Sequence, residues 1–468
     1  MIPAMSYRKH FGAVMVLGLP LAGSQIAQVS LSLVDAAMLG WYDTTALAGE
    51  IIGSSLFFVL FIAGTGFAAG LAPLVAAAEG RGDTTAARRV TRMALWLSML
   101  AGLMALPFLL QAERIFLFLG QKPEIAAAAG DYLGILAWGI FPAQGAAALK
   151  SYLAALERSR TVLVATLVSV AVNALGNYVL IFGSWGAPEL GIQGAAISSL
   201  IMHAATLAFL VAYIQRVLPG QELFVRLWRP DWEAFWAVFR LGWPISLTLI
   251  CEVGLFAFSS IMMGWVGEVA LVAHGIAMQI TSVTFMIHLG LSQAATVRAG
   301  RAHGRGTMTD INRGAAAALV LSGVVSVLTI GLFLGMPRTL MALFLDPASP
   351  DLPEIVSFGT ILLAAAAVYQ FADAYQVLAL GILRGLQDTR RPMLVAAVSY
   401  WIVGVPSAYL LAFPLGLGGI GIWIGLAIGL AMAAVWLMMR LWRGVLPRVQ
   451  REISEQYGIN AGTAPTAV

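Results

Sequence analysis

Three acidic residues lie well inside long apolar stretches of the chain: Asp35, Glu252 and Asp373. A charged side chain at the centre of a membrane costs about 2.5–3.5 kcal/mol on insertion scales, so acids in such places usually belong to ion or substrate pathways. A carboxylate bonded to neighbouring hydroxyls or amides in a purely structural role is the alternative. If Glu252 and Asp373 lie close together, they must hold a proton or a metal cation, because two buried carboxylates cannot both stay ionised alone. We therefore predict a cation site, with Na⁺ as the candidate metal, at this pair.

Polar side chains accompany these acids on the same predicted helices. Residues 369–376 read Tyr-Gln-Phe-Ala-Asp-Ala-Tyr-Gln, so one helix face offers carboxylate, amide and phenol oxygens. Such hard oxygen ligands suit a dehydrated alkali cation or a proton. Asn173 and Asn177 share a helix face, where they either join helices through hydrogen bonds or line a cavity. We expect five polar residues to line the cavity: Asn173, Asn177, Gln279, Tyr369 and Tyr375.

Asp35 lies five residues before Gly40, close to the predicted outer end of its span. Its neighbours Ser32, Val34 and Ala36 supply one side-chain oxygen, which is too few for a cation cage without other helices. We therefore predict that Asp35 is not a permanent Na⁺ ligand. Protonation of Asp35 from outside would remove the charge that holds a cationic substrate, and this step would couple substrate release to cation movement.

The composition predicts the elements that must position these residues. The chain of 468 residues is 60% hydrophobic and 11% charged, with a mean hydropathy of +0.87, which excludes an ordinary water-soluble domain. Apolar runs between charged loops, without a period-two barrel pattern, predict an all-α polytopic membrane protein with twelve transmembrane helices. The predicted spans are residues 11–40, 46–78, 89–110, 125–150, 161–182, 190–215, 235–265, 269–300, 313–335, 355–384, 392–413 and 418–440.

The basic residues predict the orientation. All of the 27 Lys and Arg residues except Arg114, Lys122 and Arg338 fall in the termini and in the loops of one side. The excess of positive charge marks the cytoplasmic side, so we expect both termini in the cytoplasm. The loops also explain the net charge of +4, and no nucleic-acid partner is expected.

The two halves of the sequence repeat each other. A single shift of the sequence along itself superposes, among others, Gly18 on Gly242, Pro20 on Pro244, Trp41 on Trp265 and Gly80 on Gly304. Six spans per copy make the halves parallel repeats, an arrangement that transporters use around a central site. We predict an N-terminal six-helix lobe at 1–216, a cytoplasmic linker at 217–234, a C-terminal six-helix lobe at 235–445 and a cytoplasmic tail at 446–468.

Motifs for catalysis are missing. The sequence has no phosphate loop, HExxH motif or nucleophile elbow, and the glycines at 416–421 lack the preceding strand of a dinucleotide site. A membrane prenyltransferase would need paired Asp-rich Mg²⁺ motifs, which are absent. His203, His274 and His288 lack metal-ligand spacing, and we interpret them as packing or cavity residues. Gly421, Gly425 and Gly429 predict close helix packing. We expect neither an enzyme nor a bound cofactor.

Four segments resemble the multidrug and toxic compound extrusion (MATE) family, specifically its bacterial NorM-like branch. They are LVDAAMLG at 33–40, LGWPISLTLICEVG at 241–254, AHGIAMQITSVTFMIHLGLSQAATVRAG at 273–300 and LRGLQDTRRPM at 383–393. The resemblance implies two six-helix lobes in a V and export of organic cations driven by inward Na⁺ or H⁺. It also implies cation-linked acids at Glu252 and Asp373, with the first-span acid at Asp35.

The resemblance carries further expectations. It implies a monomer in the bacterial cytoplasmic (inner) membrane, with small organic cationic drugs and dyes as partners beside the lipid bilayer. It favours Na⁺ over H⁺ as the coupling ion. His288 replaces an expected proline, which leaves the bend of its helix open. A related branch has an aspartate in span five, where this chain has asparagines, and this argues against that branch's N-lobe site.

A flippase for lipid-linked precursors, from the same wider superfamily, is the alternative function. Such a protein needs a basic cavity for pyrophosphate. No Lys or Arg lies in the middle of a predicted span, which favours the antiporter.

Overall fold

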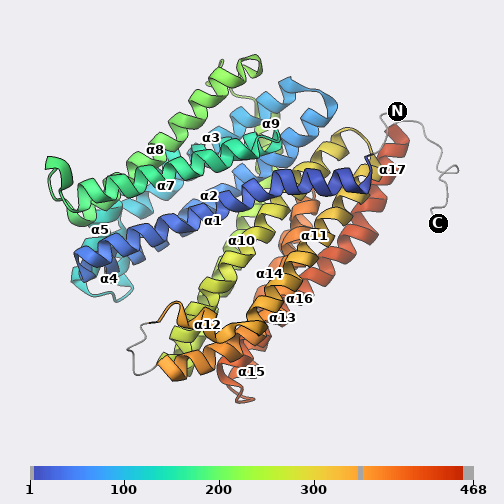
Figure 1. Cartoon of the computed structure of the whole chain (residues 1–468). Coiled ribbons are helices and arrows are strands. Elements are labelled where there is room, and N and C mark those ends of the chain that lie inside the picture. Colours follow the sequence, from blue (N-terminus) through green and yellow to red (C-terminus); the bar gives the residue numbers. More distant parts are fainter. Residues whose placement is uncertain (1–4, 346–351, 457–468) are drawn as a thin grey trace. The chain divides into compact units, whose positions relative to one another are not determined.

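The structure is a computed structural model, which describes residues 5–345 and 352–456. These residues form helices joined by short connections, without any strand (Figure 1). Twelve helices of the described part are long and apolar enough to cross a membrane. The predicted all-α fold with twelve spans is therefore confirmed.

The helices of the first sequence half extend beyond several predicted span edges. The fourth span is interrupted by a short element, since α5 continues into α6 through the 3₁₀ turn η1. The bounds are α1 Tyr7–Tyr42, α2 Thr44–Arg81, α3 Thr84–Leu110, α4 Ala112–Phe118, α5 Pro123–Leu136, η1 Ala137–Gly139, α6 Ile140–Ala155, α7 Ser159–Ile181, η2 Ser184–Gly186, α8 Gly191–Val217 and η3 Pro219–Gln221.

The second half has the same order of long helices. Its last two spans contain π-helical turns, η4 and η5. The bounds are α9 Trp232–Val266, α10 Glu268–Gly304, α11 Met308–Gly335, α12 Pro337–Ala342, α13 Leu352–Gly385, α14 Arg390–Ala397, η4 Val398–Gly404, α15 Val405–Ala412, α16 Gly418–Met439, η5 Arg440–Val445 and α17 Leu446–Gln456.

The predicted tail begins as a helix. In α17, Leu446, Val449 and Ile453 are buried and fall on one helix face, which explains why this polar segment folds. Residues 457–468 of the predicted tail lie outside the described residues.

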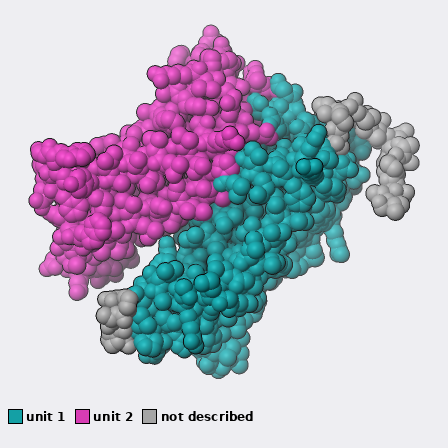
Figure 2. Space-filling view, viewed as in Figure 1, with its two compact units in different colours: residues 1–19, 76–82, 251–468 teal, residues 20–75, 83–250 magenta. Residues whose placement is uncertain are grey.

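The chain divides into two compact units (Figure 2). Unit 1 contains the chain up to Leu19, residues 76–82, and the chain from Cys251 onwards. Unit 2 contains residues 20–75 and 83–250. The divisions fall within α1, α2 and α9, so each unit takes part of these helices. The predicted lobe boundaries at the 217–234 linker stay a prediction.

The linker is bound to α3 within unit 2. Arg89 pairs with Asp231 through Nε and Nη2 at 2.5 and 3.1 Å, and Arg88 pairs with Glu222 at 2.7 Å. Trp96 Nε1 donates to the carbonyl of Leu227 at 2.9 Å. The hydrogen bond from Arg89 holds the pKa of Asp231 below its ordinary value, so a lower pH is needed to break this ion pair than to protonate a free aspartate.

Unit 1 positions α13 by hydrogen bonds from α10. Ser292 and Thr296 donate to the carbonyl oxygens of Val377 and Gly381, at 2.7 and 2.8 Å. These bonds require close backbones, and Gly381 lies where a Cβ would meet Ser292. Because the two bonds lie one turn apart, they fix the rotation of α13 about its own axis. They thereby fix the direction in which Asp373, one turn before Val377, points.

The predicted packing of the α16 glycines is confirmed. A Cβ at Gly421 would lie 2.6 Å from the Ala412 nitrogen, and one at Gly429 would lie 2.8 Å from Gly404 Cα. A Cβ at Gly425 would lie closer still to the Ala408 Cα and nitrogen. Helices α15 and α16 therefore approach along a glycine stripe.

We expect Gly425→Leu to destabilise the protein by about 1–3 kcal/mol or more, because the added side chain meets the backbone of α15. The melting temperature of the detergent-solubilised protein measures this loss. Gly331→Leu on α11 is the matched control, since a Cβ there meets nothing within 4 Å. Equal losses in the two variants would contradict the packing role.

Candidate functional site

Unit 1 brings Glu252 and Asp373 together. Glu252 on α9 is 9% exposed and Asp373 on α13 is 1% exposed, and the two carboxylates interact electrostatically. The phenol of Tyr369, one turn before Asp373, interacts with the Asp373 carboxylate. The structure thus places three of the sequence-predicted residues in one buried cluster. Their role in cation binding stays a prediction.

Several acceptor atoms near this pair have no hydrogen-bond partner among the described residues. They are Asp373 Oδ1 and the side-chain oxygens of Gln370 and Gln376, each buried. The amide nitrogen of Gln376 is used, because it donates to Tyr400 Oη at 2.5 Å. Buried acceptors without donors are costly, and a cation or an added proton would satisfy them.

Arg384 is a basic residue of α13, eleven residues after Asp373, whose electrostatic interaction with Glu252 the sequence did not reveal. It lies in the last turn of α13 and interacts electrostatically with Glu252. Its place at the end of an apolar run predicted a cytoplasmic loop residue. Two ionised carboxylates and one guanidinium leave a net charge of −1, which one monovalent cation or proton neutralises.

Aromatic side chains border the pair. Tyr369 makes edge contacts with Phe256 and Trp423, with ring centroids 6.2 and 5.5 Å apart. Trp423 Nε1 donates to His274 Nδ1 at 3.1 Å, and His274 Nε2 lies 3.2 Å from Ser260 Oγ. Two hydrogen bonds therefore hold the His274 ring in place.

Two predicted cavity residues have other surroundings. The ring of Tyr375 contacts the tilted ring of Phe371, with centroids 4.8 Å apart, and its hydroxyl lies against Gly323 of α11. Gln279 on α10 is half-buried, and its backbone carbonyl accepts a hydrogen bond from Ser282 Oγ at 2.8 Å. Their role in a cavity stays a prediction.

Unit 2 gathers Asp35 with both predicted asparagines. Asn177 Nδ2 donates to Asp35 Oδ1 at 2.5 Å, and Asn173 Nδ2 donates to Ser199 Oγ at 3.4 Å. Asn173 and Ser199 also interact with the Asp35 carboxylate. Three residues on other helices, Asn173, Asn177 and Ser199, therefore interact with the Asp35 carboxylate. The sequence alone showed only the neighbours of Asp35 in the chain. The asparagines join α7 to α1 and α8, and their amide oxygens have no partner among the described residues.

Glu50 is a second buried acid of unit 2 that the sequence did not reveal. It lies on α2, is 3% exposed, and interacts electrostatically with Asp35 and with the phenol of Tyr132. In the sequence it looks like a residue at a span edge. The available signal was the short connection between the first two spans, which sets positions 35 and 50 at similar depths.

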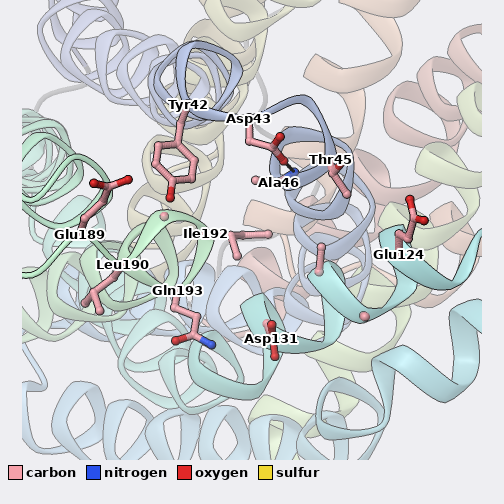
Figure 3. A pocket seen from close by; sticks show the side chains of 13 residues that line it. Tyr42, Asp43, Thr45, Ala46, Glu124, Asp131, Glu189, Leu190, Ile192 and Gln193 are labelled. Carbon is pink, nitrogen blue, oxygen red and sulfur yellow. Dashed lines mark hydrogen bonds between the residues drawn. The ribbon is translucent and has the colours of Figure 1, made fainter.

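A pocket of about 770 Å³ lies at the end of unit 2 where α1 ends and α2 begins. Figure 3 shows carboxylates around it from the α1–α2 connection, from α5 and from the segment before α8. No predicted site residue lines it. Its lining residues are Tyr42, Asp43, Thr45, Ala46, Glu124, Ala127, Ala128, Asp131, Glu189, Leu190, Gly191, Ile192 and Gln193.

The other two histidines named in the sequence analysis, His203 and His288, each contact a neighbouring side chain. His288 is buried and its Nδ1 lies 2.8 Å from Ser322 Oγ, within an uninterrupted α10. His203 stacks on Phe57 at 5.8 Å. In the described part of the chain, no group of three or more His, Cys, Asp or Glu side chains is arranged to hold a metal ion.

Known proteins match the chain along nearly its whole length. A profile of the MatE family matches residues 20–179 and again residues 244–410. The two matches begin at Pro20 and at Pro244, which the internal repeat superposes, so the repeat is confirmed. "Probable multidrug resistance protein NorM" of Rhizobium meliloti is 46% identical over 440 residues, which is 94% of each chain. The protein of the same name from Agrobacterium fabrum is 43% identical over 437 residues, covering 93% of this chain and 94% of the relative.

A solved structure shows the same fold. The crystal structure of MATE in the bent conformation superposes with a TM-score of 0.85 over 97% of this chain and 100% of that chain. The sequence identity is 19%, so this likeness bears on the fold alone.

Proposed function

This chain belongs to the MatE family, and we propose that it is a secondary active multidrug efflux antiporter that exports amphipathic organic cations in exchange for Na⁺ or H⁺. The observation that carries the proposal is the buried Glu252–Asp373 pair in a twelve-span transporter fold. The names of the relatives, multidrug resistance protein NorM, support the substrate class.

The coupling ion binds at Glu252 and Asp373. With Arg384 nearby, the ionised site has a net charge of −1 and accepts one monovalent cation. The unpartnered oxygens of Gln370 and Gln376 are hard ligands of the kind that Na⁺ prefers. The ion is cargo of the transport cycle and no chemical step takes place.

Asp35 couples the release of the drug to the movement of the ion. Its charge attracts a cationic drug, and protonation from the outer side removes that attraction. Neutral polar residues of each unit contribute to drug binding, the amides through hydrogen bonds and the two phenol rings through cation–π contacts. They are Asn173 and Asn177 in unit 2, and Gln279, Tyr369 and Tyr375 in unit 1.

The chain is a multi-pass membrane protein, and the two NorM relatives are bacterial. We place the loops and helix ends that are rich in Lys and Arg in the cytoplasm, and with them both chain termini. The α1–α2 connection then faces outwards. A monomer in the bacterial cytoplasmic membrane completes the proposal.

The flippase alternative needs basic groups that are free to hold a pyrophosphate. Two half-buried basic residues near the span ends are already engaged: Lys150 Nζ donates to Thr166 Oγ1 at 3.0 Å, and Arg384 interacts with Glu252. This engagement favours the antiporter.

Cationic dyes such as ethidium should leave proteoliposomes at least about tenfold faster than sulfonated anionic dyes of similar size, because the buried acids attract cations and aromatic faces add about 0.5–2 kcal/mol. Efflux is measured under a sodium gradient and under a proton gradient, each imposed separately. Protein-free vesicles are the control. Equal export of both dye classes would contradict the substrate assignment, and export under neither gradient would contradict antiport.

A further inference from the structure

Glu50 and Asp35 lie at the same depth in unit 2. Only Asp43 separates the end of α1 at Tyr42 from the start of α2 at Thr44, so the two helices run in opposite directions from one turn. Asp35 is seven residues before this end and Glu50 is six residues after this start. At a rise of about 1.5 Å per residue, both carboxylates lie about 10 Å from the turn.

The internal repeat supports this pairing. In the register that superposes Trp41 on Trp265, Glu50 corresponds to His274 in unit 1. The His274 ring contacts Ser260 of α9, and Ser260 corresponds to position 36 of α1. The second helix of each repeat therefore turns this position towards the first. Position 36 is Ala36, and Asp35 beside it corresponds to Ser259, so the repeat places Glu50 against α1 at the level of residues 35 and 36.

The surroundings of the two acids lack a positive charge. Asp35 and Glu50 interact with amides, hydroxyls and the phenol of Tyr132, and no Lys or Arg of the described residues pairs with either. The amide oxygens of Asn173 and Asn177 are buried beside Asp35 without a hydrogen-bond partner in the described chain. A proton on one carboxyl group turns an acceptor into an O–H donor, whose hydrogen bond these oxygens can accept. One added proton thus improves both the charge balance and the hydrogen bonding.

The acidic pocket adjoins the pair along two helices. Ala46 lines the pocket, and Glu50 lies one turn deeper on the same face of α2. Asp131 lines it too, and the next residue, Tyr132, interacts with Glu50. No Lys or Arg of the described residues lines the pocket, whose carboxylates attract cations and hydronium: Asp43, Glu124, Asp131 and Glu189 (Figure 3).

We propose that Asp35 and Glu50 share one proton, taken up from the acidic pocket at the same end of unit 2, and that Glu50 thereby sets the pH at which Asp35 releases a cationic drug. The inference rests on the proposed role of Asp35 in drug binding. The proton passes from hydronium in the pocket to a carboxylate oxygen of the pair, and no other bond changes. A neighbouring negative charge favours protonation of Asp35, so without Glu50 a more acidic solution is needed to neutralise it.

The experiment measures ethidium affinity of the purified protein as a function of pH. We expect the affinity to fall as the wild-type protein is acidified, and we expect the midpoint in Glu50→Gln to lie about one pH unit lower. Glu50→Asp keeps the charge and should retain a midpoint close to wild type. Glu113→Gln is the matched control, because Glu113 is an exposed acid at the same end of unit 2 that does not line the pocket.

An unchanged or higher midpoint in Glu50→Gln would overturn the proposal. A midpoint shift in Glu50→Asp equal to that in Glu50→Gln would also overturn it, because the shape of the side chain rather than its charge would then be required. An equal midpoint shift in Glu113→Gln would overturn it too, because it would indicate a general effect of surface charge. Asp35→Asn must remove the pH dependence altogether. Binding is measured without a gradient, so a transport failure with the expected midpoints would count against antiport and not against the shared proton.

Discussion

Gradient-driven efflux of organic cations should fall by about 100-fold or more in Asp373→Asn and in Glu252→Gln. Each replacement keeps the size of the side chain and removes one carboxylate from a buried pair. With Arg384 still present, the site then has no net negative charge left for a coupling cation. The ion gradient can then no longer drive export of the drug.

The measurement is dye efflux from proteoliposomes at equal protein content, together with radioactive sodium binding to the purified variants. Glu354→Gln is the matched control, since Glu354 is an exposed acid in the first turn of the same helix, α13. That variant should transport like wild type. Full transport by Asp373→Asn in correctly inserted protein would remove this pair from the coupling mechanism.

The hydrophobic pattern predicted the fold because the membrane imposes it. Each span needs a long apolar run, so all twelve spans could be located from the sequence. The repeat could be located in the same way, from paired positions such as Pro20 and Pro244. Asp35, Glu252 and Asp373 stood out because an acid in an apolar run is costly.

Contacts between distant helices could not be predicted in this way. Glu50 and Arg384 lie near the ends of apolar runs, where an acid or a base is ordinary, and only the folded helices show that both reach a buried carboxylate. Asp35 finds its partners in distant segments of the chain, as in the hydrogen bond from Asn177. A count of its chain neighbours therefore underestimated how well this carboxylate is held.

Asp35→Asn should weaken drug binding by at least about tenfold, equivalent to about 1.4 kcal/mol, while Na⁺ affinity at Glu252 and Asp373 stays within about twofold of wild type. The amide keeps the size of the side chain but has no charge to attract a cationic drug. It therefore imitates the protonated, drug-releasing state. Asp35 belongs to unit 2 and the cation pair to unit 1, so the variant leaves the ligands of the coupling ion in place.

The deciding measurement is drug affinity and Na⁺ affinity on the same preparation of Asp35→Asn. Asn177→Asp is an informative companion, because Asn177 Nδ2 donates to Asp35 and the change would replace a donor with a second negative charge. If Asp35 acts through its charge, the companion variant should bind the cationic drug at least as well as wild type while Asp35→Asn binds it poorly. Loss of Na⁺ binding with unchanged drug affinity in Asp35→Asn would instead make Asp35 a ligand of the coupling ion, and the division of roles between the two acidic clusters would have to be reversed.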